Sequence, residues 1–248
     1  MTKDQIFPFT LKSHDAVVKG RAVVLGKTLA MVYEGKGWPL PVKRIVAEAC
    51  PVAVGVAALS GHVDLKVLAV HGDGAIRDLN VGVSGGHKYS AYVHYDSQVE
   101  QWGDNMPQLF GGGFLSFLSA GSSEARQHIL RGVNIDEAAL TDCVMNYWRM
   151  LGNREIALKT AVSADASIAA CIAIEKPGDS EADEEDDERT ALQKDSFWRD
   201  AVIAMAGVKD DDMLSNLPLA LDKRLGGLHF KLGEPVKAKF WDYKQEAE

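Results

Sequence analysis

The sequence has few cysteines, and their spacing limits the chemistry that they can perform. The three cysteines, Cys50, Cys143 and Cys171, lie far apart in apolar segments, and none belongs to a C-x-C or C-x-x-C pair. Free cysteines in such segments are typically small buried hydrophobic residues rather than nucleophiles or metal ligands. We therefore predict neither a metal site nor a structural need for disulfide bonds.

Long apolar runs and basic clusters are also missing. No window approaches the roughly 20 apolar residues that span a membrane, and the opening segment, MTKDQIFPFT, has no apolar run of signal-peptide length. The net charge is −8, and no lysine or arginine cluster could bind a phosphate backbone. We expect a cytoplasmic protein without nucleic-acid or membrane partners, whose 46% hydrophobic content suffices for a core.

The stretch Val63–Val83 predicts a central β-hairpin. Apolar residues recur at every second position on both sides of His71-Gly72-Asp73-Gly74, whose small residues suit a tight turn. A dinucleotide-binding loop would need a third glycine and a following helix, but Gly74 leads into another β-patterned run. This turn therefore does not bind a nucleotide, and ATP use is not expected.

The rest of the first 176 residues predicts an α+β fold, in which hairpin-rich sheets pack with helices. The expected strands cover residues 16–26, 89–95, 114–119 and 128–135, with a hairpin over 155–162 and 168–175. Expected helices cover residues 27–35, a buried segment that starts near Pro41 and is kinked or divided by Pro51, and 136–151. A polar loop is expected over 98–108.

The composition changes abruptly after residue 176. Residues 179–188 (DSEADEEDDE) form an acidic run that is typical of a solvated linker. This change predicts a core domain over 1–176, an acidic linker over 177–190 and a helical segment over 191–248. In the last segment we expect a short helix around Pro218 and an amphipathic helix with the apolar face Phe197, Trp198, Ala201, Val202 and Met205.

No catalytic motif stands out among the titratable residues. No two of the seven histidines are spaced i, i+4 on a predicted helix, and no Cys/His pairing has zinc-finger spacing. No cofactor is therefore predicted. One alternative stays open, because His71, Asp73 and His87 could meet in a cleft and serve a small-molecule enzyme.

Several motifs, taken in order and spacing, resemble the 33 kDa chaperonin family of redox-regulated heat-shock chaperones. The Val70–Gly74 turn is similar to the family's Q-G-D-G turn, and the resemblance covers almost the whole chain. The other motifs are Val18-Lys19-Gly20-Arg21, Trp38-Pro39-Leu40-Pro41-Val42, Ala47-Glu48-Ala49, the glycines before Phe114, Arg131-Gly132-Val133, Asn146-Tyr147-Trp148-Arg149 and Ala169-Ala170-Cys171-Ile172-Ala173-Ile174.

The resemblance departs from the family at the zinc ligands. Family members continue into a zinc domain with a C-x-C and a later C-x-x-C motif. Here Pro235–Lys239 (PVKAK) stands in register before the first motif, but Phe240-Trp241-Asp242 follows, and all four zinc-binding cysteines are absent from the sequence. Thiolates hold zinc and release it on oxidation, so we do not expect the family's redox switch in this chain.

The resemblance implies an ATP-independent holdase that binds unfolded proteins, works as a homodimer and is not an enzyme. We place client binding on Phe197, Trp198, Ala201, Val202 and Met205, with binding that is constitutive or controlled by temperature. Two further alternatives stay open: the helix packs on the core and chaperone activity is lost, or the chain is a regulatory adaptor for one folded partner.

Overall fold

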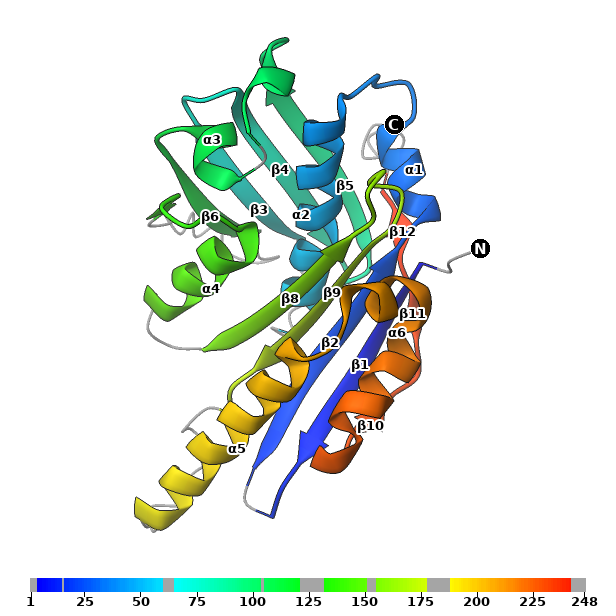
Figure 1. Cartoon of the computed structure of the whole chain (residues 1–248), viewed down its shortest axis with the longest axis vertical. Helices are drawn as coiled ribbons and strands as arrows, with labels where there is room; N and C mark the ends of the chain where they lie inside the picture. The colour runs from blue at the N-terminus through cyan, green and yellow to red at the C-terminus, as the bar shows by residue number, and fades with distance from the viewer. Residues whose placement is uncertain are drawn as a thin grey trace.

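The computed structural model describes residues 4–14, 16–59, 65–103, 105–120, 132–150, 155–177 and 188–241. Within these residues the strands form two six-stranded sheets. Sheet A has the order β10-β1-β2-β9-β8, with β11 also paired to β1, and sheet B has the order β12-β5-β4-β3-β6-β7. Helices pack against both sheets, which confirms the predicted α+β class (Figure 1).

Sheet A is made of two hairpins and two short strands from the C-terminal region. The hairpins are β1 (Gln5–Lys12) with β2 (Val17–Leu25) and β8 (Ile156–Val162) with β9 (Ala169–Glu175), and β2 pairs with β9. The short strands are β10 (Lys231–Leu232) and β11 (Val236–Lys237). Strand β1 was not predicted, because Pro8 within it is a residue that strands usually exclude.

Sheet B contains the predicted central hairpin. Its strands are β3 (Leu65–Gly72), β4 (Ile76–Ser84), β5 (Lys88–Tyr95), β6 (Gly113–Ala120), β7 (Val133–Asn134) and β12 (Lys239–Phe240). The antiparallel pairing of β3 with β4, in which Val70 lies opposite Leu79 and Leu68 opposite Val81, confirms the hairpin. Residues 121–131, which include most of the strand expected over 128–135, lie outside the described part.

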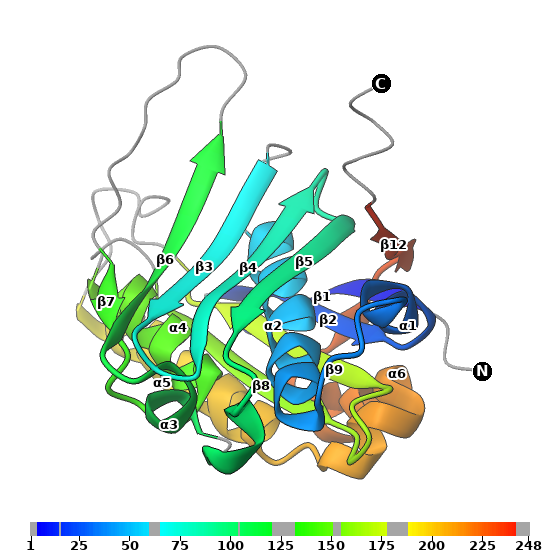
Figure 2. The same ribbon diagram turned by 90° about the horizontal axis from the view of Figure 1, so that it is seen from above.

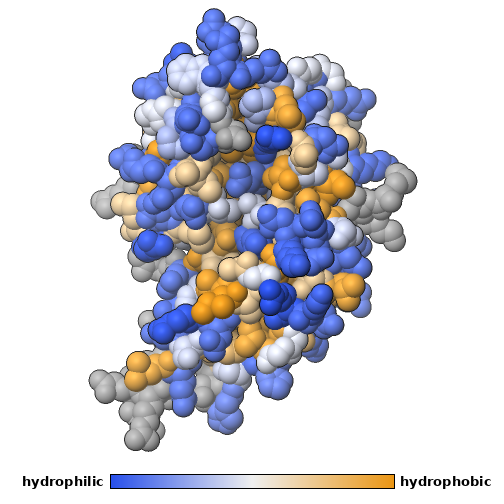
Figure 3. All heavy atoms as spheres, in the orientation of Figure 1, coloured by the Kyte–Doolittle hydropathy of each residue, from blue (hydrophilic) through white to orange (hydrophobic). Residues whose placement is uncertain are grey.

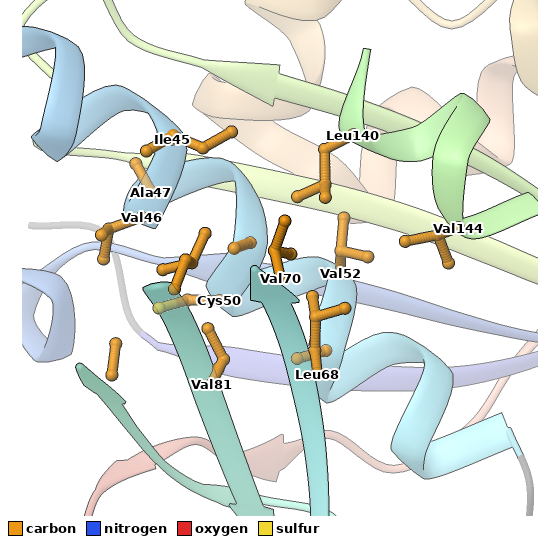
Figure 4. Close-up of a cluster of buried hydrophobic side chains, with 14 of the residues drawn as sticks. Ile45, Val46, Ala47, Cys50, Val52, Leu68, Val70, Val81, Leu140 and Val144 are labelled. Atoms are coloured by element: carbon orange, nitrogen blue, oxygen red, sulfur yellow. The ribbon is translucent and has the colours of Figure 1, made fainter. Parts of the chain in front are cut away.

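Helix α2 (Leu40–Leu59) lies between the two sheets (Figure 2). Its small and β-branched residues are buried on nearly every side, and Figure 4 shows Cys50 and Val52 facing Leu68, Val70 and Val81 of sheet B. Of the two expected effects of Pro51, a kink or a division of the helix, division is wrong, because α2 runs continuously through Pro51. Packing against both sheets offsets the hydrogen bond that proline removes.

The remaining helices of the first part are short. They are α1 (Lys27–Tyr33), η1 (Val99–Gln101), α3 (Met106–Phe110) and α4 (Leu140–Met150). The predicted loop over 98–108 therefore contains helical turns, and α3 starts with a recognisable signal, since the Asn105 side chain accepts a 2.9 Å hydrogen bond from the Gln108 amide. Helix α4 starts at Leu140, later than the predicted residue 136.

A buried carboxylate connects the N-terminus of α1 to both sheets. Asp4 Oδ1 accepts hydrogen bonds from the Gly26 amide (2.7 Å), the Thr28 amide (3.1 Å) and the Thr28 hydroxyl (2.8 Å). The Tyr89 hydroxyl of β5 in turn donates to Thr28 Oγ1 at 2.6 Å. Burial holds the pKa of Tyr89 well above its ordinary value, so this phenol stays a donor at neutral pH.

Two glycine-rich turns interlock at one end of sheet B. The Gly74 amide donates to the Phe110 carbonyl at 2.8 Å, and Asp73 Oδ1 accepts from the Gly112 amide at 2.7 Å. A Cβ on Gly74 would lie 2.6 Å from the Gly111 nitrogen and 2.6 Å from the Phe110 carbonyl carbon. The Gly-Asp-Gly turn and the triple glycine are therefore partners in one backbone contact.

Helices α5 (Glu188–Ala206) and α6 (Asp210–Leu225) cover the face of sheet A that points away from α2 (Figure 1). The described layers thus follow the order sheet B, α2, sheet A, and the α5–α6 pair. Helix α6 bends at Asn216, where the φ of −153° is non-helical, two residues before Pro218. The helix predicted around Pro218 is therefore present, and it bends next to that proline.

Candidate functional site

The largest apolar interface outside the central core lies between the α5–α6 pair and sheet A. Alternate residues of β1, β2, β8 and β9 point to this side, because side chains of a strand alternate between faces. Helix α6 contributes residues that are buried among them. The buried members include Phe7, Phe9, Leu11, Ala22, Val24, Ile172 and Ile174 from the sheet and Met213, Leu217, Leu221 and Leu225 from α6. We call this cluster, with the α5 residues below, the docking interface.

The predicted binding residues of α5 lie in the docking interface. Trp198 is 7% exposed, Ala201 0% and Met205 2%, whereas Phe197 and Val202 are half-buried and pack against the same cluster. The periodicity correctly predicts one apolar face, but the structure shows that α6 and sheet A together bury most of it. These side chains therefore contact another molecule only if the helix moves.

Helix α5 also extends further toward the N-terminus than expected. It starts at Glu188, within the segment 177–190 that was predicted to be a linker, and residues 178–187 lie outside the described part. The acidic composition therefore did not mark the helix boundary.

Two lysines, Lys159 of β8 and Lys176 directly after β9, make polar contacts with the helix pair. Lys176 Nζ lies 2.7 Å from Asp195 Oδ1 of α5 and 3.5 Å from Glu155 Oε2. Lys159 Nζ donates to the Ala206 carbonyl at 3.1 Å and lies 3.2 Å from Asp210 Oδ1. These contacts hold the middle of α5 and the junction between the two helices.

The charges of the Lys176–Asp195 pair stabilise each other. The hydrogen bond with Lys176 lowers the pKa of Asp195, and the bond with Asp195 raises the pKa of Lys176. The pair therefore keeps its charges at neutral pH; it weakens only as the pH falls through the lowered pKa of Asp195 or rises through the raised pKa of Lys176. Exposed ion pairs contribute about 0–1 kcal/mol, so docking depends mainly on apolar burial.

The outer side of the helix pair carries scattered apolar residues. Leu192 is 70% exposed, Ile203 64% and Leu219 61%. On the face shown in Figure 3, apolar residues form separate patches among polar ones. Isolated exposed residues of this kind are common on protein surfaces, so the continuous apolar surface lies within the docking interface.

Sequence reasoning missed the half of this interface that sheet A provides. The alternation of Phe7, Phe9 and Leu11 in QIFPFTLK was a usable signal, although Pro8 obscured it. The buried residues of β9 gave a weaker signal, because both faces of this strand are covered and its apolar run does not alternate.

The residues of the enzyme alternative do not meet in one site. His71 Nδ1 hydrogen-bonds to Asp78 Oδ1 at 2.6 Å, whereas Asp73 accepts from the Gly112 amide. His87 lies in the turn after β4, where its Nδ1 contacts the Gly85 carbonyl at 2.8 Å. At ~3.3 Å per residue, β4 separates that turn from His71 by roughly 20 Å, so the three residues cannot act on one small substrate.

His71 instead belongs to a row of side chains across the outer face of sheet B. Its ring packs on Phe114 with 5.0 Å between centroids, and Asp78 also lies 3.6 Å from His94 Nδ1. Phe114 is 47% exposed and Tyr92 of the neighbouring row 55%. No described element covers this face, and its groups make a mixed polar and apolar surface.

The three cysteines are buried among apolar residues. Burial raises the pKa of Cys50 and Cys171 far above the ordinary range and that of Cys143 to about 11. All three are therefore protonated thiols at neutral pH, and thiols react much more slowly than thiolates. Within the described ranges, His, Cys, Asp and Glu side chains form no group of three that could hold a metal ion.

Comparisons with known proteins agree on one family. A family model described as Hsp33 protein matches residues 4–229. Among solved structures, the fold is similar to that of the 33 kDa chaperonin (heat shock protein 33 homolog) of Thermotoga maritima, with a TM-score of 0.75 and 14% sequence identity over 99% of this chain and 83% of that chain. No curated protein sequence matches the chain. In the described part, no helix has the length and apolar character needed to cross a membrane.

Proposed function

Because the chain belongs to the Hsp33 protein family, we propose that it is an ATP-independent holdase, which binds unfolding proteins in the cytoplasm as a homodimer. The family supports a chaperone-type function, and the proposal adds the mode of action and the binding surface. The observation that carries it is the docking interface, a continuous apolar surface of sheet A that the helices α5 and α6 cover.

Release of α5 and α6 from sheet A exposes apolar residues on both sides of the docking interface. Phe197, Trp198, Ala201, Val202 and Met205 then form one side of the client-binding surface, and sheet A forms the other. Apolar segments of an unfolding protein bind there because burial removes their surface from water at about 25 cal/mol per Å². This driving force needs no nucleotide, which suits a chain without a nucleotide-binding loop.

Locking the helices onto sheet A is expected to abolish protection of clients. A carbodiimide joins a lysine and a carboxylate that are already in contact, so it should link Lys176 to Asp195 across 2.7 Å and Lys159 to Asp210 across 3.2 Å. Thermal aggregation of a client is followed by light scattering with untreated and cross-linked protein. Untreated protein should suppress aggregation, and cross-linked protein should not.

The matched control removes the reactive carboxylates. The Asp195→Asn/Asp210→Asn variant should keep protection after carbodiimide treatment, because amides do not couple to lysine. Protection by the fully cross-linked wild type would contradict the proposed surface. If untreated protein gives no protection, the burial of Trp198, Ala201 and Met205 instead reflects a permanently closed structure without chaperone activity.

Mild oxidation is expected to leave the temperature at which protection begins unchanged. The pKa of every thiol is raised, and Cys50 and Cys171 are 0% exposed in the folded protein. Aggregation assays with diamide and with dithiothreitol should therefore give the same onset. Thiol titration should detect almost no reactive cysteine before denaturation and three afterwards. Stronger protection of the client in diamide than in dithiothreitol would contradict the prediction, because it would show that thiol oxidation activates this chain.

A further inference from the structure

Sheet A has a second face, opposite the docking interface, and α2 covers only part of it. Figure 2 shows α2 and sheet B on this side of sheet A. An added Cβ on Gly55 of α2 would lie 3.4 Å from Ala173 Cβ, so the helix packs closely on the middle of this face. Toward the turn between β1 and β2, however, Val17 is 42% exposed, and Lys12 and Lys19 are exposed as well. Within the described residues, this end of the face is open to solvent.

Strand register gathers four basic side chains at the open end. Residues that lie opposite each other in paired antiparallel strands point to the same face. Lys231 of β10 lies opposite Thr10 of β1, which lies opposite Lys19 of β2. Lys12 and Arg21 share this face, because each is two residues along its strand from one of them. We call Lys12, Lys19, Arg21 and Lys231 the basic face.

The basic face differs in charge from the molecule as a whole. The chain has a net charge of −8, but the rows of paired residues that hold the basic face contain one acidic residue, Glu175, opposite Lys19. Lys159 and Lys176 on the helix side form ion pairs, whereas in the described part of the chain the three lysines of the basic face form none. An excess of positive charge therefore remains.

The guanidinium of Arg21 is held in place within the basic face. Its Nη1 donates to the Gly20 carbonyl at 2.8 Å. Partial burial lowers the pKa of Arg21, while attraction to Glu175 raises it, and an arginine side chain stays charged at neutral pH. Because a half-buried charge is screened less by water, Arg21 attracts an anion more strongly than an exposed lysine does.

The spacing of the charges suits an acidic polypeptide in an extended conformation. Lys19 and Arg21 are two residues apart on one strand, about 7 Å, which is also the spacing of side chains at alternate positions of an extended chain. Lys231 is two strands away from Lys19, roughly 10 Å. The exposed Val17 and the half-buried Pro8 lie among these charges and offer apolar surface to aliphatic parts of the bound segment.

A nucleic acid fits the basic face less well. Proteins that bind single strands stack the bases on aromatic side chains, and the rows of sheet A that hold the basic face contain no aromatic residue. A long phosphate polymer would also extend past these few cations, where the net charge of −8 repels it. A short acidic segment stays within the positive area.

We propose that the basic face is a binding site for acidic segments of other polypeptides, which lie extended along β2. Carboxylates at alternate positions of the segment pair with Lys19 and Arg21, and flanking carboxylates pair with Lys12 and Lys231. The site is accessible while α5 and α6 are docked, because it lies on the opposite face of sheet A. It does not depend on the proposed holdase function.

Fluorescence anisotropy with the full chain at low ionic strength tests this site. The probe is a fluorescein-labelled peptide of seven Glu-Thr repeats, and a peptide of seven Gln-Thr repeats is the uncharged control. The Lys12→Gln/Lys19→Gln/Lys231→Gln variant should bind the Glu-Thr peptide at least tenfold more weakly than the wild type. Added salt should weaken wild-type binding, since it screens exposed charges, and the Gln-Thr peptide should not bind.

A matched variant separates the basic face from overall charge. Lys27→Gln/Lys209→Gln/Lys223→Gln removes three exposed lysines elsewhere and should bind like the wild type. Equal losses in both variants, or no binding by the wild type, overturn the proposal. Binding of the peptide only after residues 179–188 are replaced by a Gly-Ser linker also overturns it, because the chain's own acidic run would then be the occupant.

Two further measurements complete the test. An oligouridylate with seven phosphates has the same number of charges as the Glu-Thr peptide, and tighter binding of this RNA at the basic face would overturn the proposal in favour of a phosphate polymer. Client protection is measured separately by light scattering. Peptide binding at the basic face without any client protection would support this site and overturn the proposed holdase function.

Discussion

Truncation of Trp198 to alanine is expected to open the docking interface at a temperature roughly 10 °C lower than in the wild-type protein. The Trp198 side chain is 7% exposed and packs with residues of sheet A and α6. Truncating a buried tryptophan costs about 3–5 kcal/mol, and for a chain of this size each kcal/mol corresponds to roughly 2–4 °C. The exposed ion pairs of Lys159 and Lys176 cannot compensate for this loss.

The assay separates helix release from client binding. Limited proteolysis of α5 reports release, and light scattering reports protection of a client during a temperature ramp. Trp198→Ala should lower the onset of both, and it should also reduce the maximum protection if the indole belongs to the client-binding surface. Ile203→Ala is the control on the same helix, because that side chain is 64% exposed. Early proteolysis without early protection would argue against α5 as the regulator of client binding.

Substitution of Gly74 by alanine is expected to destabilise the whole fold by about 3 kcal/mol or more. Its added Cβ would meet backbone atoms of Phe110, Gly111 and Leu109 at 2.6–2.8 Å. No side chain can rotate away to make room, so one of the two interlocked turns must move. That movement would strain the hydrogen bond from the Gly74 amide to Phe110 and the one from the Gly112 amide to Asp73.

Thermal unfolding followed by circular dichroism measures this effect. The Gly74→Ala variant should lose at least about 6 °C in its midpoint, or remain insoluble on expression. Gly226→Ala is the matched control, since nothing lies within 4 Å of the added Cβ and the backbone there is helical. It should be neutral or slightly stabilising, because alanine restricts the unfolded chain more than glycine does. A Gly74→Ala midpoint equal to that of the control would mean that the turns separate easily.

The sequence predicts which side of a helix is apolar better than it predicts which elements pack against that side. The face formed by Trp198, Ala201 and Met205 was recognised from its i, i+3, i+4 spacing, which is a local property of the chain. Whether that face is exposed depends on α6 and on strand β8 of sheet A, which the pattern within α5 cannot reveal. The partner of His71 also depends on the tertiary structure. His71 hydrogen-bonds to Asp78, which lies opposite it on the paired strand, and not to Asp73, which is closer in sequence.

The sequence by itself determined the α+β class, the central hairpin, the buried helix α2, the apolar face of α5 and the lack of paired thiols. These features depend on local periodicity or composition, which need no knowledge of distant segments. Only the tertiary structure decided that α5 and α6 dock on sheet A, that the two glycine turns interlock and that β10, β11 and β12 join the edges of both sheets. Strands of two residues have no period to detect, because neighbouring strands supply the hydrogen bonds and burial that hold them.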